Sequence, residues 1–586
     1  MMARREKMAN RIVIDPVTRI EGHLRIEAAL DSENTITEAY SAGTMVRGIE
    51  NILKKRDPRE AWAFAQRICG VCTTVHAIAS IRAVEDALGI KIPKAANLMR
   101  NMIVAQQFIH DHVMHFYILH ALDFVDVVSS LKADPKKVSD IQQTISGWPN
   151  SSPAYFAEVQ KKVKAIVDSG QLSLFSHGYW GHPAYQLPPE INLLGVAHYL
   201  ECLDWQSQVT KIHTILGGKN PHPNFVVGGV PLPIDMNSDQ ALNAAALSVI
   251  ADSIQKMRNF VEQVYLPDLL AIAPYYLDYA SIGEGLGNFL TWGEFPEGDL
   301  NELDRLIFPR GVIINRDLKQ VITPDPREAA KMKEFITHSW YKYRQGDSAG
   351  LFPWEGETAF NFTGPKPPFD YLEVEGKYSW LKSPRWNELP MEVGPLARVL
   401  ILYAKGHEET VGLVNSTLEA LKAPLTAVFS TLGRTAARAI ETKVIVGLLQ
   451  KFYDELVAEI KAGRTETFNS EKWDPGSWPK KAMGFGYTEA PRGALGHWVV
   501  IENKKIKNYQ VVVPTTWNAS PRDHKNQPGA YEASLVGTRL ARPEEPLEIL
   551  RTIHSFDPCL ACAVHLIDAR GQVVGEAGTG FNLVVK

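Results

Sequence analysis

The sequence predicts a mainly α-helical chain with smaller β regions, an α+β fold with a long-helix bundle as its core and β-hairpins or small sheets at its periphery. Apolar or amphipathic runs at helical spacing fill three parts of the chain, whereas strand-like alternation is confined to its two ends. Of the 586 residues, 45% are hydrophobic and 22% are charged, which is ordinary for a soluble globular protein. No low-complexity tract or internal repeat divides the chain, so we expect one large unit.

The N-terminal part of the chain is expected to pass from strands to helices. From Arg11 to about Ala42, the segments RIVI, HLRIEAAL and ITEAYSAG read as strands separated by polar turns. HAIASIRAVEDALG, which begins at His76, has apolar residues at helical spacing, and Gly89 is a candidate C-cap. Pro93 opens a long run that is apolar on most sides, which predicts a buried helix.

Helical patterns continue on both sides of one irregular region. Long amphipathic runs near 191–216 and 239–265 predict further helices, and helical pattern returns from about 396 to 463. Residues 266–395 are rich in Pro, Gly and Trp, which indicates an ordered, irregular surface region rather than a linker. HWVVIENKKIKNYQVVVP, from His497, predicts a β-hairpin.

Charge and hydropathy exclude several classes of protein. The formal net charge is −4 and basic clusters are short, so nothing favours binding to nucleic acid or to an anionic membrane. The N-terminal segment lacks the apolar core of a secretory signal. No stretch reaches the roughly 18 uncharged apolar residues of a spanning helix. We therefore expect a soluble chain, or one that reaches a membrane only through a partner.

Four of the five cysteines form two Cys-x-x-Cys pairs near opposite ends of the chain. RICGVC contains Cys69 and Cys72, and DPCLACAVH contains Cys559 and Cys562. Such a pair brings two thiolates to one side of a turn or helix, which suits a soft metal. The fifth cysteine, Cys202, is expected to be a buried small hydrophobic residue.

Both pairs have neighbours that favour a thiolate site. Asp557 is expected to cap a helix on which Cys559, Cys562 and His565 share one face, and the amides at the start of that helix would lower the thiolate pKa values. His76, on the helix after the first pair, is placed to donate a hydrogen bond to a metal-bound sulfur.

Spacing alone leaves alternatives open. A structural zinc site is one, although zinc ribbons and fingers usually join pairs about 12–20 residues apart. Two independent redox pairs would need a small βαβ context that neither motif has, and the pairs need not meet at all. From spacing we favour a shared metal site, with zinc as the first choice of metal.

The cysteine motifs belong to a longer colinear pattern. TRIEGHLRIE precedes RICGVC, and three further motifs, NPHPNFVVGG, EAPRGALGHW and VVPTTWN, lie between RICGVC and HSFDPCLACAVH. Together these motifs resemble the nickel-iron hydrogenase large subunit. The chain looks closest to the membrane-associated respiratory uptake enzymes, and the resemblance runs from about Ile12 to the C-terminus. It implies the fold of that subunit and the reversible oxidation of H2 to protons and electrons.

The resemblance implies one Ni–Fe centre held by all four thiolates. Cys69 and Cys559 would bind nickel terminally, and Cys72 and Cys562 would bridge nickel to iron, whose other ligands in the family are carbon monoxide and cyanide. Heterolytic splitting of H2 needs a Lewis acid for the hydride and a nearby base for the proton. Cys559 is the base that we favour.

Further site residues follow from the same resemblance. Glu21 matches a carboxylate that passes the proton outward, and Arg492 matches an arginine over the metals that is a rival base. By residue type alone, Glu21 would be a structural carboxylate and Arg492 an ordinary salt-bridging arginine. Asp111, in an apolar helix, needs a charged partner if it is buried, and Arg492 is the candidate. The residues matched to the ligand pocket and to the arginine's surroundings are Pro491, Thr515, Asp111 and Asp557.

Two more sites are implied. Glu50, the carbonyl group of Val511 and His565 match a site for magnesium or a similar divalent cation near the C-terminus, and oxygen ligands suit such a hard cation. His222 matches a loop near the electron exit, although a loop histidine with only structural hydrogen bonds is an equal alternative.

The end of the chain resembles a maturation tail. In the family, a maturation endopeptidase removes such a segment once nickel is loaded, so residues 566–586 are expected to be cut off. Residues 1–565 are then the single large-subunit unit, and the printed sequence is its precursor.

The cysteine count also implies a partner. If four of the five thiols serve one centre, the one left, Cys202, cannot hold an iron–sulfur relay. We therefore expect a heterodimer with an iron–sulfur small subunit, which can pair into a dimer of heterodimers. By resemblance, the small subunit carries the export signal and a membrane cytochrome b accepts the electrons. The complex would lie on the periplasmic side of the cytoplasmic membrane, with the cytoplasm as the alternative. A non-catalytic relative with a structural zinc site is the other functional class.

Overall fold

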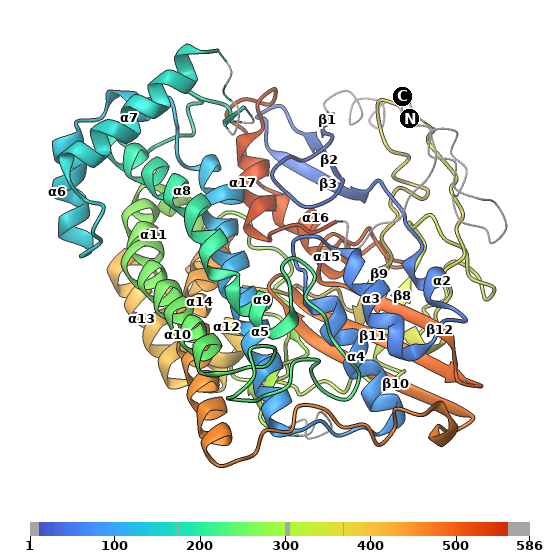
Figure 1. Cartoon of the computed structure of the whole chain (residues 1–586). Helices are drawn as coiled ribbons and strands as arrows, with labels where there is room; N and C mark the ends of the chain where they lie inside the picture. Colours follow the sequence, from blue (N-terminus) through green and yellow to red (C-terminus); the bar gives the residue numbers. More distant parts are fainter. Residues whose placement is uncertain are drawn as a thin grey trace.

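A bundle of long helices forms the core, as predicted. The computed structural model describes residues 11–298 and 305–560, apart from positions 171, 173, 174, 177 and 367. Helices α5 (Lys94–Met114), α8 (Pro189–Val209), α10 (Ala244–Phe260) and α14 (Thr431–Lys461) pack together on one side of the molecule (Figure 1). Apolar side chains from all four share one large buried cluster. Helix α5 is buried along almost its whole length, which explains why its sequence is apolar on most sides.

Shorter helices surround this bundle. Helix α5 runs into a π-helical turn, His115–His120, and α10 runs into a second one, Val261–Tyr265. The other α-helices in the described part of the chain are α2 (Ile49–Leu53), α3 (Ala61–Ala65), α4 (Val75–Leu88), α6 (Pro135–Ile145), α7 (Pro153–Asp168), α9 (Lys211–Gly217), α11 (Leu266–Ile272), α12 (Pro395–Ala404), α13 (Glu408–Leu421), α15 (Pro514–Asn518), α16 (Ala530–Leu535) and α17 (Leu547–Ser555).

The N-terminal strands form an antiparallel sheet that the C-terminal helices cover. Its strands, in the order β1 (Arg11–Ile14), β2 (Leu24–Leu30) and β3 (Ile36–Gly43), confirm the three predicted segments. Leu24 and Ile26 from β2 pack in one apolar cluster with side chains from α16 and α17. Figure 1 shows this sheet, in blue, beside the red C-terminal helices. The two ends of the described chain therefore share one core.

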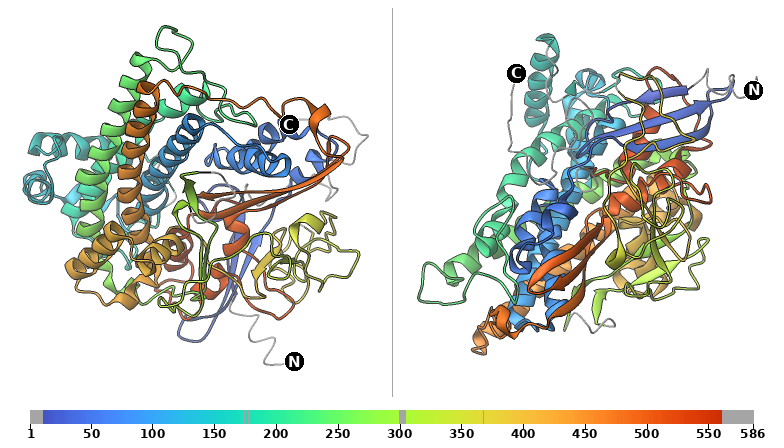
Figure 2. Two further views of the ribbon diagram at one scale, coloured as in Figure 1. Left: turned by 90° about the horizontal axis from the view of Figure 1, so that it is seen from below. Right: turned by 90° about the vertical axis from the view of Figure 1, so that its right-hand side faces the viewer.

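A second antiparallel sheet, in the order β10 (Lys481–Ala490), β11 (Gly493–Glu502) and β12 (Lys505–Val512), packs against α4. The predicted hairpin is β11–β12, and β10 is a third strand that the hairpin reading did not include. At Gly484 and Gly486 a Cβ atom would lie 2.0 and 1.9 Å from carbonyl oxygens of α4, so only glycine permits this close approach. Figure 2 (left) shows blue helices between the helical bundle and these long orange strands.

The middle of the chain is ordered and irregular, but much of it is not surface. Its strands pair in twos: β4 (Phe289–Thr291) with β7 (Gly311–Ile313), β5 (Glu294–Pro296) with β6 (Leu306–Phe308), and β8 (Met332–Phe335) with β9 (Ser383–Trp386). Trp292 and Trp380 are at most 1% exposed and belong to separate apolar clusters. The aromatic residues that distinguish this region from a linker therefore build two of its cores. Among the described residues, no helix combines the length and apolar character needed to cross a membrane.

Candidate metal centre

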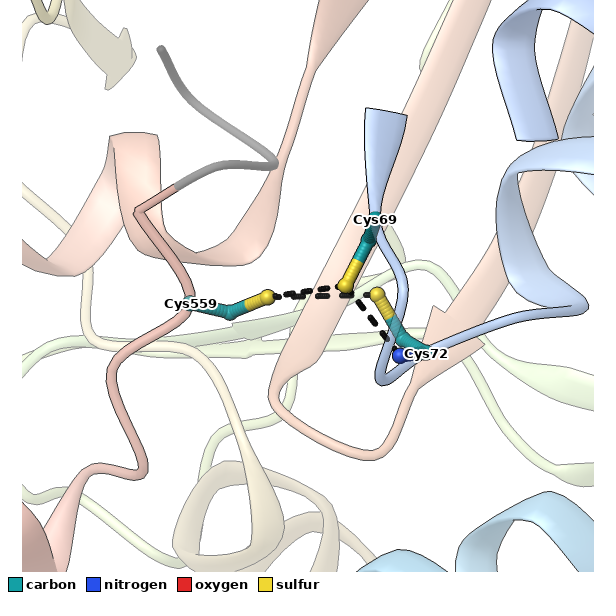
Figure 3. Close-up of side chains that lie close together, drawn as sticks. All are labelled: Cys69, Cys72 and Cys559. Atoms are coloured by element: carbon teal, nitrogen blue, oxygen red, sulfur yellow. Dashed lines mark hydrogen bonds between the residues drawn. The ribbon is translucent and has the colours of Figure 1, made fainter. Parts of the chain in front are cut away.

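Three cysteine sulfurs from the two ends of the chain meet in the interior. Cys69 follows the 3₁₀ turn Gln66–Ile68, Cys72 lies just before α4, and Cys559 follows α17. The Sγ atom of Cys559 is 3.3 Å from that of Cys69 and 3.9 Å from that of Cys72 (Figure 3). All three side chains are at most 2% exposed. Segments 490 positions apart thus form one buried site.

The spacing of the sulfurs fits a metal centre and not a disulfide. A disulfide would bring two sulfurs to about 2.05 Å. Thiolates around one tetrahedral metal, with metal–sulfur bonds of about 2.3 Å, lie roughly 3.8 Å apart. The observed separations of 3.3 and 3.9 Å are close to that value. Buried, soft thiolate donors of this kind suit soft or borderline transition metals, zinc and iron among them.

The backbone around the first pair stabilises a thiolate. The N–H groups of Val71 and Cys72 donate to the Sγ atom of Cys69 at 3.3 and 3.1 Å. Donors directed at a sulfur favour its ionised form, which is the form that binds a metal. The tight turn after Cys69 is what directs both amides at this one sulfur.

The segment that carries Cys559 is extended and not helical up to Leu560, where the described residues end. Asp557 was expected to cap a helix, but its φ is +58°, in the left-handed region, and residues 558–560 pair with Glu21 instead. The N–H group of Glu21 donates to the Pro558 carbonyl at 3.3 Å, and that of Leu560 donates to the Glu21 carbonyl at 2.6 Å. This tertiary pairing overrides the local helix-start signal. Cys562 and His565 lie outside the described residues.

Two side chains hold or face Cys559 directly. Its backbone N–H donates to Thr515 Oγ1 at 3.1 Å, which satisfies a buried amide. Its Sγ atom lies 3.3 Å from Glu21 Oε2. Glu21 is only partly buried, so its carboxylate connects the buried sulfur with the outer part of the structure.

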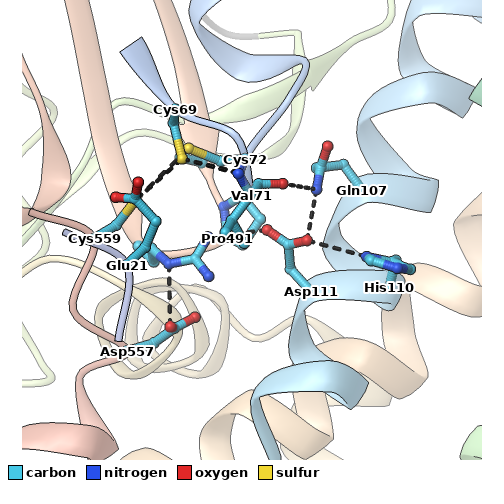
Figure 4. A network of polar contacts seen from close by, with 12 residues as sticks. Glu21, Cys69, Val71, Cys72, Gln107, His110, Asp111, Pro491, Asp557 and Cys559 are labelled. Atoms are coloured by element: carbon cyan, nitrogen blue, oxygen red, sulfur yellow. Dashed lines mark hydrogen bonds and ion pairs between the residues drawn. The ribbon is translucent and has the colours of Figure 1, made fainter. Parts of the chain in front are cut away.

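A buried arginine, Arg492, pairs with two carboxylates near the sulfurs. Figure 4 shows these carboxylates, Asp111 and Asp557, close to the three cysteines. The Arg492 guanidinium donates to Asp111 Oδ2 at 2.9 Å and pairs with Asp557 Oδ1 at 3.1 Å. All three side chains are at most 3% exposed. Burial alone would lower the pKa of Arg492, but the charges of Asp557, Cys559, Asp111 and Cys72 raise it well above its usual value. The arginine is therefore a permanent cation, and the partner expected for Asp111 is present.

Gln107, on α5, joins the cysteine loop to this ion pair, and sequence reasoning did not identify it. Its amide nitrogen donates to Asp111 Oδ1 at 2.6 Å and to the Val71 carbonyl at 3.2 Å (Figure 4). Its oxygen accepts from the hydroxyl groups of Thr73 and Thr74 at 3.2 and 3.3 Å. Asp111 lies four residues further along the same helix, but Val71, Thr73 and Thr74 come from the cysteine loop, so the helix sequence alone does not reveal this role.

Two predicted histidines lie near the first pair. His76, on α4, is 1% exposed, and burial lowers its pKa to about 4 although the charge of Cys69 opposes that change. Its Nδ1 atom lies 3.1 Å from His497 Nε2. His222 is partly buried and has a φ of +59°. Burial lowers its pKa, and the charge of Cys69 opposes that change. Their expected roles stay predictions.

The residues predicted for the second metal site are adjacent where they are described. Glu50 is 6% exposed, and its Oε1 atom accepts from the Val511 N–H at 2.9 Å. Its other oxygen contacts the Thr358 hydroxyl group and lies 3.8 Å from Lys382 Nζ. The third expected ligand, His565, is outside the described residues, so the arrangement supplies one carboxylate beside a backbone segment and an ammonium group.

The remaining predicted residues are also placed. Pro491 lies in the turn between β10 and β11, immediately before Arg492. Cys202 is fully buried in the helical core, with its Sγ atom 3.7 Å from Met114 Sδ. The expected tail, 566–586, and the N-terminal extension before Arg11 are outside the described residues.

Comparisons with known proteins agree with this geometry. A family model described as nickel-dependent hydrogenase matches residues 47–565, and one described as HoxL-like matches residues 11–42. The uptake hydrogenase large subunit of Bradyrhizobium diazoefficiens is 53% identical over 97% of this chain and 98% of its own length. The hydrogenase-1 large chain of Escherichia coli is 49% identical over 96% of both chains. The Ni-Fe-Se hydrogenase of D. vulgaris Hildenborough superposes with a TM-score of 0.74 at 32% identity, over 95% of this chain and 99% of that one.

Proposed function

The chain belongs to the nickel-dependent hydrogenase family as a large subunit, and from this premise we propose that it is the catalytic subunit of an uptake hydrogenase. It oxidises H2 reversibly to protons and electrons. One observation carries the proposal: Cys69, Cys72 and Cys559 converge in a buried site beside Glu21 and Arg492.

The thiolates of Cys69, Cys72 and Cys559 would hold the Ni–Fe centre, and by the family resemblance Cys562 would be the fourth ligand. When bound there, the centre supplies the Lewis acidity that polarises H2 and the redox capacity that accepts its electrons. We assign carbon monoxide and cyanide to its iron, as the family resemblance implies. We assign the side chains of Pro491 and Thr515 to the lining around these diatomic ligands.

Proton transfer is the work of the chain itself. The thiolate of Cys559 takes the proton, and Glu21 receives it across the 3.3 Å between Sγ and Oε2. Because Glu21 is only partly buried, it passes the proton toward solvent. The 3.3 Å contact is the first link of this path.

Arg492 supplies a fixed positive charge over the site. Its pairing with Asp111 and Asp557 orients the guanidinium fork, and the raised pKa of Arg492 keeps it protonated. A fixed cation in a buried site stabilises developing negative charge without reorganisation. In this arrangement Arg492 is an electrostatic group, and Cys559 remains the base. His76 is assigned to hydrogen bonding with a metal-bound sulfur.

A second cation of the magnesium type is assigned to Glu50, the Val511 carbonyl and His565. Glu50 is buried and next to Val511, which supports a shared role. Lys382 lies 3.8 Å from Glu50 and 3.4 Å from Glu334, so the charge of this neighbourhood is already balanced in part.

The electrons leave through an iron–sulfur small subunit. Three described cysteines form the centre and Cys202 is fully buried in the helical core, so no described cysteine is available for a cluster relay. Relatives named large subunits imply such a heterodimer. A membrane cytochrome b as acceptor, a peripheral place on the periplasmic side of the membrane, and removal of residues 566–586 by a maturation endopeptidase complete the proposal.

Metal analysis of the purified heterodimer tests the function. We expect one nickel per large subunit, H2 oxidation, and infrared bands from metal-bound carbon monoxide and cyanide. Cys69→Ser should lose nickel and activity, because it removes one of the converging ligands. Cys202→Ser, at an equally buried cysteine in the helical core, should keep both. Zinc in place of nickel in the wild-type complex would contradict the proposal.

A further inference from the structure

A second buried arginine, Arg398 on α12, clamps the turn that presents Arg492. Its Nη1 donates to the Ala490 carbonyl at 3.0 Å, and its Nη2 donates to the Pro491 carbonyl at 2.8 Å. These are the two residues immediately before Arg492. Ala490 pairs with Gly493 across the β10–β11 hairpin, so Pro491 and Arg492 form its two-residue tip. The clamp therefore acts on the shortest piece of backbone that determines where Arg492 points.

Every donor of Arg398 is used. Besides the two carbonyl groups, Nη1 donates to Glu489 Oε2 at 2.8 Å, Nη2 donates to Glu441 Oε2 at 2.8 Å, and Nε donates to Glu441 Oε1. A guanidinium has five N–H groups in a rigid planar fork. Five donors with five acceptors leave the group no alternative orientation. Arg398 is 2% exposed, so water cannot replace any of these partners cheaply.

Glu441, one acceptor of Arg398, is linked to the helix that carries Asp111. Glu441 is on α14 and accepts a further contact from His112 Nε2 at 2.8 Å. His112 follows Asp111 on α5, and Asp111 binds Arg492 at 2.9 Å. Helix α5 therefore contacts Arg492 directly through Asp111, and it is linked to Arg398 indirectly, through His112 and Glu441. Arg398 therefore holds the backbone of the hairpin tip, and Asp111 holds the side chain of Arg492.

We propose that Arg398 is a positioning residue for Arg492: its clamp on the Ala490 and Pro491 carbonyls fixes the peptide planes before Arg492 and so aims the guanidinium over the metal centre. The inference rests on the proposed function only in that Arg492 serves H2 oxidation. A planar peptide transmits the direction of its carbonyl to the next Cα. Displacement of a catalytic group by about 1 Å can cost roughly 100-fold in rate.

Arg398→Lys in the assembled heterodimer tests the proposal, because lysine keeps the charge but its three donors cannot span five acceptors. We expect faster hydrogen–deuterium exchange in residues 488–495, in metal-loaded and in nickel-free protein alike. We expect kcat for H2 oxidation to fall between about 10-fold and 100-fold, with KM for H2 little changed. In an Arg492→Lys background, the same substitution should change kcat less than about 2-fold, since Arg398 acts through Arg492.

Arg100→Lys is the matched control. Arg100 is 1% exposed, forms a two-point ion pair with Glu85 and donates to the Gly229 and Val226 carbonyls, in a different loop. It should raise exchange near 226–229, leave 488–495 unchanged and leave the kinetic parameters near wild type.

The outcomes separate the clamp from the function. Unchanged exchange in 488–495, or equal losses of kcat in the wild-type and Arg492→Lys backgrounds, would overturn the proposal. If Arg492→Lys alone leaves kcat intact, the assigned role of Arg492 fails, and exchange still decides whether the clamp exists. Should Arg398→Lys not assemble, Glu489→Gln removes one acceptor at constant volume, and we expect smaller changes in the same direction.

Discussion

Two adjacent glutamines on α5 offer a sharp test of how the site is held. Gln107 donates to Asp111 Oδ1 at 2.6 Å and to the Val71 carbonyl at 3.2 Å, and it accepts from two threonine hydroxyl groups. Gln106 is equally buried, yet neither of its amide atoms has a hydrogen-bond partner among the described residues. Methionine has a similar volume and no amide. Gln107→Met therefore removes an amide that has hydrogen-bond partners, and Gln106→Met removes one that has none among the described residues.

Gln107→Met should destabilise the fold, whereas Gln106→Met should not. Gln107→Met loses a hydrogen bond to a carboxylate, at about 1.5–3 kcal/mol, and one to a carbonyl, at about 0.5–1.5 kcal/mol. The free energy of unfolding should therefore fall by about 3 kcal/mol. Gln106→Met removes a buried amide without partners, whose burial costs about 1–3 kcal/mol, so stability should stay the same or rise.

Thermal unfolding of the purified heterodimer measures the difference. The entropy of unfolding is about 2.1 cal/mol/K per residue, or roughly 1.2 kcal/mol/K for a chain of this length. Gln107→Met should lower Tm by about 2 °C, and Gln106→Met should not lower it. Nickel retention against a chelator should fall only in Gln107→Met, because Gln107 tethers the loop of Cys69 and Cys72. Equal shifts in the two variants would refute the reasoning.

Two further predictions concern the amide of Cys559 and a buried histidine. Thr515→Val removes the acceptor of the Cys559 N–H and should cost about 1–3 kcal/mol with loss of bound nickel, whereas Thr515→Ser keeps the hydroxyl and should behave like wild type in the same unfolding and metal assays. Burial lowers the pKa of His213 from 6.5 to about 4. Between those pH values, the imidazole is therefore protonated in the unfolded chain and neutral in the folded chain. The stability that His213 contributes is therefore complete above pH 6.5 and is lost as the pH falls toward 4; His213→Asn should reduce the pH dependence of the unfolding free energy by about 1.4 kcal/mol per pH unit in that window, and an unchanged slope would contradict this.

The sequence predicted the regular elements well because their signals are local. Periodicity identified the strands β1 to β3, the long helices and the C-cap at Gly89, whose φ is +67°. Strand β10 was not recognised because Gly484 and Gly486 weaken its strand pattern. Both glycines are required because α4 packs closely against the strand, and no local sequence pattern reveals that contact.

The site required information of a different kind. Residue chemistry favoured a shared metal site, but only the family resemblance indicated nickel and iron. Asp557 carries a helix-start signal that lost to main-chain pairing with Glu21. Gln107 and Arg398 were not recognised, because contacts with residues distant in sequence define their roles: Gln107 donates to the Val71 carbonyl, and Arg398 donates to the Pro491 carbonyl.

The shared core of the two chain ends also has a consequence for synthesis. The N–H group of Ser41, on β3, donates to Glu532, which is 491 positions away, at 3.0 Å. The apolar side chains of β2 are covered by α16 and α17, which are made equally late. A ribosome that adds about 5–20 residues per second needs roughly 25–100 s to produce that cover. For this interval the apolar face of the first sheet lacks its cover, and exposed hydrophobic surface of this kind makes a nascent chain prone to aggregation.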